Sequence, residues 1–153
     1  MKLEDSEIIA GDRIGNVYLG MTYEEFCKLY GYNDKSYEGS CRFKITLENF
    51  SVWFTNDKKI LDEIIVFGNF KGKFKNTIGI GSTLTDIEKY RKYIGDYYEP
   101  YDYSDIYAFK DCDGICFELL DIDALTDDYI EYDYDAIKKL LPIQYITIFK
   151  GKP

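Results

Sequence analysis

Apolar and polar residues alternate along several short stretches of the chain, with the period of two that is typical of β-strands. Phe43, Ile45 and Leu47 lie on one side of such a stretch, with polar residues between them. Because short turn-prone sequences separate neighbouring stretches, the pattern predicts antiparallel meanders. Residues 111–114, Asp-Cys-Asp-Gly, predict one of these hairpin turns. The predicted strands are residues 41–47, 51–55 and 60–67 in the first half, and 106–110, 115–120 and 144–149 in the second.

Other stretches carry apolar residues three and four positions apart, which is the spacing of an amphipathic helix. The predicted helices are residues 23–30 with Phe26, Leu29 and Tyr30 on the apolar face, residues 84–94 with Ile87, Tyr90 and Ile94, and residues 136–141.

The starts of the first two helices repeat one phrase, 61 residues apart: Leu-Gly-Met-Thr-Tyr-Glu-Glu-Phe at 19–26 and Ile-Gly-Ser-Thr-Leu-Thr-Asp-Ile at 80–87. In each copy a threonine, Thr22 or Thr83, precedes an acidic residue by three positions, which is the pattern of a capping box. A similar series of strands follows each copy. The sequence therefore predicts an α+β fold of two tandem helix-plus-antiparallel-meander units that form one domain over residues 1–153. The two pseudo-repeats are 13–73 and 74–153, the second with an acidic insertion at 121–142.

Two stretches of the second unit have no counterpart in the first, residues 96–105 and 121–142, and both are rich in acids and tyrosines. Insertions on a repeated scaffold form loops, and loops carry binding residues more often than the scaffold does. Tyrosine offers contact area at low entropic cost, and carboxylates complement a cationic partner. Two alternatives stay open, a solvated acidic surface and a metal site. The candidate partner-binding residues are Tyr97, Tyr98, Glu99, Tyr101, Asp102, Asp121, Asp123, Asp127, Asp128, Tyr129, Glu131 and Asp133.

The catalytic inventory is mostly negative, because the chain has no histidine. That absence removes the commonest general base and every triad that depends on imidazole. Cys112 and Cys116 with two further cysteines are a poor basis for a zinc site, so no metal and no cofactor are expected. Carboxylates are so plentiful that no particular pair indicates a hydrolase.

The net charge is −9, which disfavours binding to nucleic-acid phosphates and favours a basic partner. No stretch reaches 18 uninterrupted apolar residues, so no membrane span is expected. The first twelve residues lack the apolar centre of a signal peptide, and we therefore expect a cytoplasmic protein with reduced thiols. These residues are also expected to be poorly anchored, apart from an extended piece at 7–10.

The doubled phrase, Gly20-Met-Thr-Tyr-Glu-Glu-Phe and Gly81-Ser-Thr-Leu-Thr-Asp-Ile, each followed by a meander, resembles the tandem-repeat fold of beta-lactamase inhibitory protein. An acidic chain of this length without catalytic residues is also similar to the immunity proteins of polymorphic and contact-dependent growth-inhibition toxin systems, over about residues 13–150. That resemblance implies a non-enzymatic cytoplasmic inhibitor, which binds and blocks a cognate toxin domain that is basic and nuclease-like. The alternative is a scaffold or small-ligand-binding domain whose concave sheet holds an apolar molecule.

Overall fold

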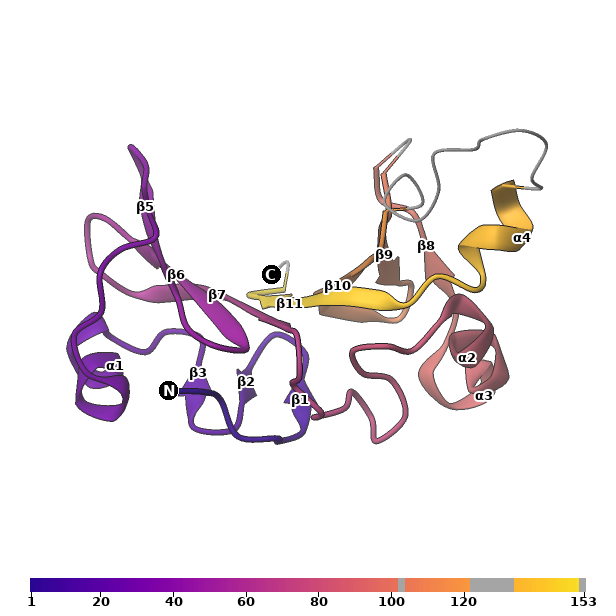
Figure 1. Ribbon diagram of the computed structural model, residues 1–153, viewed down its shortest axis with the longest axis horizontal. Helices are drawn as coiled ribbons and strands as arrows, with labels where there is room; N and C mark the ends of the chain where they lie inside the picture. The colour runs from indigo at the N-terminus through magenta and orange to yellow at the C-terminus, as the bar shows by residue number, and fades with distance from the viewer. Residues whose placement is uncertain (102–103, 122–133, 152–153) are drawn as a thin grey trace.

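The computed structural model describes residues 1–101, 104–121 and 134–151, which form two antiparallel sheets and several short helices (Figure 1). The larger sheet has eight strands in the order β4–β5–β6–β7–β11–β10–β9–β8. In that order they are β4 (Tyr37–Glu38), β5 (Arg42–Thr46), β6 (Phe50–Thr55), β7 (Leu61–Phe67), β11 (Ile143–Phe149), β10 (Cys112–Leu119), β9 (Ile106–Phe109) and β8 (Tyr97–Tyr98). The predicted α+β class is thus confirmed, with more sheet than helix.

Both halves of the sheet are built from an edge towards the centre. The first four strands run from β4 inward to β7, and the last four run from the opposite edge, β8, inward to β11. As a result β7 and β11, the final strand of each half, pair with each other in an antiparallel ladder. Tyr145 lies opposite Phe67 at one end of this ladder and Phe149 lies opposite Glu63 at the other.

The core lies on one face of the eight-stranded sheet, as the alternation predicts. Phe43 and Ile45 of β5 are buried, and Leu47, at the end of the same stretch, is partly buried against them. The central strands β7 and β11 contribute only aliphatic side chains to this face. The other buried apolar side chains of the sheet are Phe50, Val52, Phe54, Leu61, Ile64, Val66, Tyr107, Phe109, Ile115, Phe117, Leu119, Ile143, Ile146 and Ile148.

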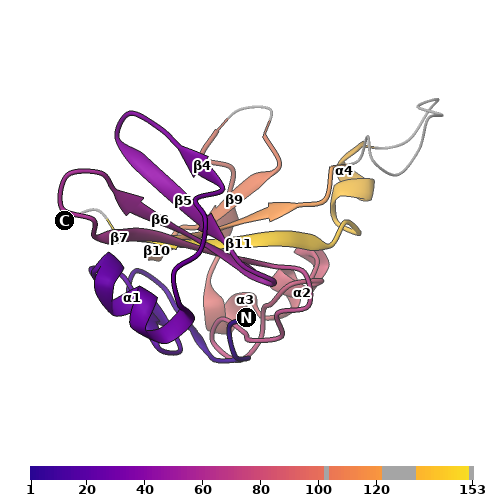
Figure 2. The same cartoon turned by 60° about the vertical axis from the view of Figure 1, so that its left-hand side comes forward.

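Short helices cover the core face of the sheet (Figure 2). They are α1 (Tyr23–Tyr30), α2 (Leu84–Lys89) and α3 (Arg91–Ile94), and a fourth, α4 (Tyr134–Lys138), lies beside the second half of the sheet. Both predicted capping boxes are present: the Thr22 and Thr83 hydroxyls accept from the backbone N–H three residues on, and each threonine N–H donates to the carboxylate there. None of the helices among the described residues has the length and apolar character to cross a membrane.

Three details of the predicted helices are wrong. Leu29 is 42% exposed, and Cys27 takes the buried place beside Phe26 instead. The helix predicted at 84–94 is two helices, because the backbone at Tyr90 (φ −100°, ψ 14°) leaves the helical region between α2 and α3. Tyr90 therefore turns away from the core, while Ile87 and Ile94 stay buried. The helix predicted at 136–141 lies earlier, at Tyr134–Lys138.

The N-terminal residues are anchored, contrary to expectation. The Asn49 side chain, itself buried, accepts from the Leu3 N–H at 2.7 Å and donates to the Leu3 carbonyl at 2.9 Å. The side chain of Leu3 is buried in the core, as is that of Ile8. A three-stranded antiparallel sheet follows, made of β1 (Ile8–Ile9), β2 (Arg13–Ile14) and β3 (Val17–Tyr18). The polar composition of residues 1–12 suggested a loose segment. It gives no sign of the anchor, because one distant side-chain amide, that of Asn49, bonds both the N–H and the carbonyl of Leu3.

The turn predicted at 111–114 belongs partly to β10, whose register with β9 shifts between Cys112 and Cys116. Gly114 has a positive φ of +82°, and its carbonyl accepts from the Gly11 N–H at 3.1 Å. A Cβ at this position would lie 2.6 Å from the Gly11 Cα, so only glycine permits the approach. This contact holds the loop after β1 against the start of β10.

We predict that Asn49→Ala lowers the free energy of unfolding by about 2–4 kcal/mol, because it leaves the buried N–H and carbonyl of Leu3 without partners. Urea denaturation followed by far-ultraviolet circular dichroism measures the change. Asn56→Ala is the matched control, since Asn56 is exposed and its side chain makes one hydrogen bond, to the Gly39 carbonyl. Equal stability of the two variants would contradict the anchoring role of Asn49.

Candidate functional site

The face of the eight-stranded sheet opposite the core, here named the open face, has no helix over it among the described residues. In both views α1, α2, α3 and the three-stranded sheet lie below the larger sheet, and the outer strands rise above its centre on either side (Figures 1 and 2). The sheet therefore forms a cradle whose floor is β7 and β11. Among the described residues, helices and the smaller sheet cover only one of its two faces, so the second face is the natural candidate for a binding site.

A row of small and uncharged side chains crosses the middle of the open face. Cross-strand pairing places these residues side by side, because each is the direct partner of the next on the neighbouring strand. No charged residue interrupts the row, which we name the central row. From β5 to β9 its members are Thr46, Ser51, Ile65, Thr147, Cys116 and Ala108.

Aromatic side chains flank the central row on both sides. On one side Trp53 and Phe149 are separated by Glu63, the direct partner of both. On the other side the rings of Phe67 and Tyr145 meet edge to face, with centroids 5.9 Å apart. All four rings are partly exposed, although each is large enough to be costly to leave in water. The open face therefore presents aromatic surface around an uncharged centre.

Trp53 is held by a cluster of polar and aromatic groups. The Arg42 guanidinium lies 4.5 Å from the centre of the Trp53 ring and donates to Glu63 Oε2 at 2.8 Å and to Asp62 Oδ1 at 3.4 Å. The ring of Tyr37 on the edge strand β4 meets Trp53 edge to face at 5.6 Å. These contacts hold the indole in one position, so little freedom remains to this side chain.

The middle of the open face is hollowed. A depression of about 340 Å³ is lined by Lys44, Thr46, Ser51, Ile65, Phe67, Glu118, Tyr145 and Thr147, and we name it the central hollow. The hydroxyl of Thr46 lies within 2.9 Å of those of both Ser36 and Ser51, so the hydroxyls on the β5 side already bond one another. Glu118 is half-buried, and burial followed by the charge of Asp105 raises the pKa of its carboxyl.

Of the twelve predicted partner-binding residues, five lie within the described residues. Tyr97 and Tyr98 form the edge strand β8, followed by Glu99 and Tyr101, while Asp121 lies just beyond β10. Tyr98, Glu99, Tyr101 and Asp121 are exposed, and Tyr97 is half-buried. Tyr98 is the direct cross-strand partner of Ala108, so it extends the central row to the edge strand of the open face. Tyr97, Glu99 and Tyr101 lie in or just after β8, away from the middle of that face. Asp102, Asp123, Asp127, Asp128, Tyr129, Glu131 and Asp133 lie outside the described residues.

Tyr97 serves the fold as much as the surface. Its hydroxyl donates to Glu88 Oε1 of α2 at 3.0 Å, and its ring meets Tyr107 edge to face at 5.7 Å. Burial, and then the bond to Glu88, raise the pKa of Tyr97 to about 12, so the phenol remains a donor at neutral pH. Glu99 pairs with Lys138 Nζ of α4 at 3.8 Å. These contacts tie α2 and α4 to the edge of the sheet.

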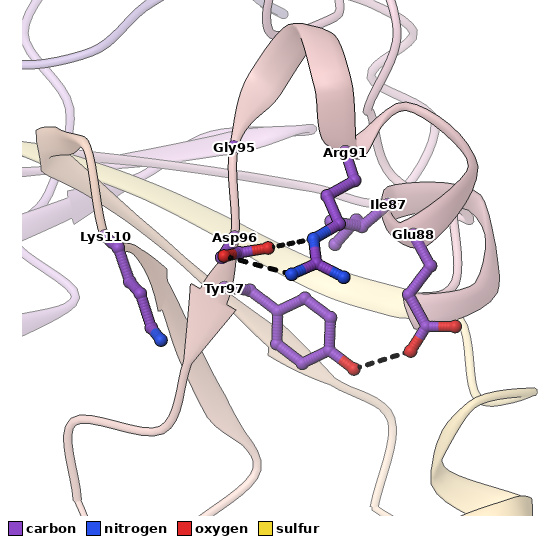
Figure 3. A pocket seen from close by; sticks show the side chains of 7 residues that line it. All are labelled: Ile87, Glu88, Arg91, Gly95, Asp96, Tyr97 and Lys110. Atoms are coloured by element: carbon purple, nitrogen blue, oxygen red, sulfur yellow. Dashed lines mark hydrogen bonds and ion pairs between the residues drawn. The ribbon is translucent and has the colours of Figure 1, made fainter.

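A second hollow, of about 470 Å³, lies where α2 and α3 meet β8 (Figure 3). Its charged groups are occupied with each other: Arg91 forms an ion pair with Asp96, and Glu88 accepts from Tyr97. Lys110 lines the other side (Figure 3). Because Asp96 neutralises Arg91, this hollow attracts an anionic ligand less strongly than the presence of an arginine and a lysine suggests.

Among the described residues, no group of three or more His, Cys, Asp or Glu side chains could hold a metal ion. Cys116 lies in the central row, where burial raises the pKa of its thiol to about 11. It is therefore a neutral thiol at physiological pH and a poor nucleophile. Cys27, Cys41, Cys112 and Cys116 are all free thiols.

Sequence reasoning offered a concave sheet only as the alternative site and did not identify the residues of the open face. The signal was present in Phe67, Tyr145 and Phe149, which are apolar at positions that alternate with core residues and so must point away from the core. No protein-family model matches the chain, and no curated protein or solved structure matches it either.

We predict that Tyr97→Ala lowers the free energy of unfolding by about 2 kcal/mol, because it removes a half-buried ring and its hydrogen bond. Tyr98→Ala, the adjacent but exposed residue, should change it by no more than about 0.5 kcal/mol. Thermal and urea unfolding of both variants measure the difference. If both substitutions lower the free energy of unfolding by the same amount, the contacts of Tyr97 do not stabilise the fold, and Tyr97 remains only a candidate binding residue.

Proposed function

We propose that this protein is a non-enzymatic inhibitor that binds another protein through the open face. In its most concrete form it is a cytoplasmic immunity protein, which blocks a cognate toxin domain that is basic and nuclease-like. One observation carries the proposal: an uncovered sheet face with an uncharged centre, pre-positioned aromatic rings and charged groups at its sides. The resemblance in sequence to immunity proteins and to beta-lactamase inhibitory protein supports the same reading.

The composition of the open face is that of a protein-binding surface. The centres of protein interfaces are poor in charged residues and rich in aromatic ones, and the rim around them is polar. The central row supplies the uncharged centre, and Trp53, Phe67, Tyr145 and Phe149 supply the aromatic groups. Tryptophan and tyrosine are also the residues that most often dominate binding energy. A soluble monomer seldom leaves such a surface without a use.

Charge favours a basic partner. The chain carries 28 acidic against 19 basic residues, and the predicted binding residues at the β8 side add carboxylates beside the open face. A field of this sign speeds the encounter with a cationic protein and disfavours nucleic acid. In a nuclease-like partner the cationic cleft binds phosphates, and carboxylates would occupy the same positions.

A binding role is also favoured over catalysis. The chain has no histidine, and the thiol in the central row is neutral at physiological pH. The alternative of a small apolar ligand has one observation in its favour, the central hollow of about 340 Å³, which reaches the lower end of the size of ligand pockets. That hollow is half polar in character and lies on the surface of the sheet rather than inside the core. A protruding segment of a protein fits it better.

We further propose that the domain consists of two tandem units, and equivalent contacts support this. The N–H of Gly20 donates to the Leu61 carbonyl at 2.8 Å, and that of Gly81 donates to the Ile143 carbonyl at 2.9 Å. Both glycines have φ +92°, and each precedes the N-cap threonine of a helix by two residues. The β6–β7 and β10–β11 ladders also pair their residues in the same pattern.

In the first half the β6–β7 register shifts after Trp53, whose partner is Glu63, and in the second half the β10–β11 register shifts after Glu118, whose partner is Tyr145. The four direct pairs before each shift correspond one to one along the two ladders, ending at Phe50 with Val66 in the first and Ile115 with Ile148 in the second. Two units that share a helix start, a helix-to-strand hydrogen bond and a β-bulge are the expected product of duplication.

The first test of the function is affinity capture with the wild-type chain, followed by co-expression with each basic domain retained. A true partner should be toxic alone and harmless in the presence of this chain. Trp53→Ala and Phe149→Ala should then each weaken binding at least about tenfold, since both remove aromatic contact area from the open face. Calorimetry measures the affinity, and Tyr93→Ala, an exposed aromatic change on α3, is the control. Unchanged affinity in the two open-face variants, with folding intact, would show that the partner binds elsewhere.

The second test concerns the acidic insertion. Changing Asp121, Asp123, Asp127, Asp128, Asp133 and Asp135 to Asn should leave the melting temperature nearly unchanged and slow the association with the partner. The wild-type rate should also fall with salt, as the Debye length drops from about 10 Å at 0.1 M to about 3 Å at 1 M. Stopped-flow fluorescence at both salt concentrations measures this. Association at the wild-type rate would assign the insertion to a solvated surface.

A further inference from the structure

The central hollow contains a carboxylate between aromatic groups. Glu118 on β10, Tyr145 on β11 and Phe67 on β7 are successive cross-strand partners, so their side chains stand side by side in one line. All three line the hollow and all three are half-buried. The line places one negative charge at the end of a pair of rings that meet edge to face.

The carboxylate of Glu118 makes no ion pair and no hydrogen bond among the described residues, whereas its backbone pairs with β9 and β11. Other half-buried carboxylates of the open face are satisfied: Glu63, for example, accepts from Arg42 at 2.8 Å. Partial burial without a partner is unfavourable for an ionised carboxylate, which is why the pKa of Glu118 is raised. A cationic group brought to this position would remove that penalty.

We infer that the central hollow binds an arginine or lysine side chain of the protein partner, with Glu118 as its counter-ion and the rings of Phe67 and Tyr145 beside its stem and charged head. The inference rests on the proposed function and names the anchor residue that the partner supplies. Cations are attracted to the faces of aromatic rings, most strongly where water is excluded. Arginine suits the hollow better than lysine, because its planar guanidinium can stack on a ring while it donates two hydrogen bonds to one carboxylate.

Lys44 makes the charge of the central hollow asymmetric, positive on the β5 side and negative on the β10 side. It lines the same depression from β5, on the opposite side of β7 and β11 from Glu118, and it also lies 5.5 Å from the centre of the Trp53 ring. A cation entering over β5 would be repelled by Lys44, whereas one entering over β10 would meet Glu118. The partner segment should therefore cross the cradle with its basic side chain over β11 and β10.

The test uses two blocked tripeptides as probes, acetyl-Gly-Arg-Gly-amide and acetyl-Gly-citrulline-Gly-amide, titrated into the 15N-labelled 153-residue chain. Citrulline has nearly the shape of arginine without its charge. The arginine peptide should shift the backbone amide signals of Glu118, Tyr145, Thr147 and Phe67 in a saturable manner, and the citrulline peptide should not. Glu118→Gln should abolish the saturable shift, and Glu24→Gln on α1 should leave it unchanged. Lys44→Gln should tighten binding of the arginine peptide.

Equal shifts from the two peptides, or none from either up to roughly 10 mM, would overturn the inference. So would retention of arginine binding in Glu118→Gln. These outcomes are separable from the fate of the proposed function. A hollow that binds the arginine peptide in a chain that captures no toxic partner would contradict the inhibitor role alone. A partner that binds wild type and Glu118→Gln equally well would contradict the hollow as its anchor point alone.

Discussion

The antiparallel ladder between β7 and β11 is the contact on which the rest of the molecule depends. It joins residues 63–67 to residues 145–149, at the end of each half of the chain. Without it, each half would be a four-stranded sheet whose innermost strand exposed a row of unpaired backbone groups. The ladder removes both of those edges at once and leaves only the two-residue strands β4 and β8 at the outside. Edges this short offer little backbone for unwanted pairing with another chain.

The same ladder determines what the two faces can be. Ile64 and Val66 point into the core with Ile146 and Ile148, so Ile65 and Thr147 must point the other way. The helices and the small N-terminal sheet cover only the core face (Figure 2). An apolar residue such as Phe67 on the other face therefore stays in contact with solvent. Which residues of β7 and β11 point into the core also determines which residues form the open face, because side chains alternate along a strand.

Sequence reasoning recovered the elements whose signals are local. Thr22 and Thr83 cap helices as predicted, because a capping box is satisfied by atoms three residues apart. The strands predicted from alternation are also present, within a few residues at their ends. The N-terminal anchor was missed because Asn49 acts on Leu3, 46 residues away, and nothing near either residue announces the contact. The two-residue strands β4 and β8 are too short to show any period.

The candidate site was predicted only in part, for a related reason. Acid and tyrosine content drew attention to residues 96–105 and 121–142, and in the first of these Tyr97 and Glu99 are tied to α2 and α4 by Glu88 and Lys138. The open face is assembled from alternate residues of several strands, so its members are not adjacent in the sequence. Its character emerges only once the register is known.

Register also explains how one scaffold could acquire an asymmetric site. The equivalent positions of the two ladders hold different side chains: Trp53 in β6 corresponds to Glu118 in β10, and each sits at the same register shift. In the first half this position holds an indole that Arg42 covers, and in the second it holds a carboxylate that nothing among the described residues covers. A symmetric pair of units would present the same group twice and would bind a partner equally well in two orientations. Placing an aromatic group at one position and a negative charge at the other makes the two orientations unequal in energy. In the proposed binding mode, a partner with one basic side chain would therefore dock in one orientation only.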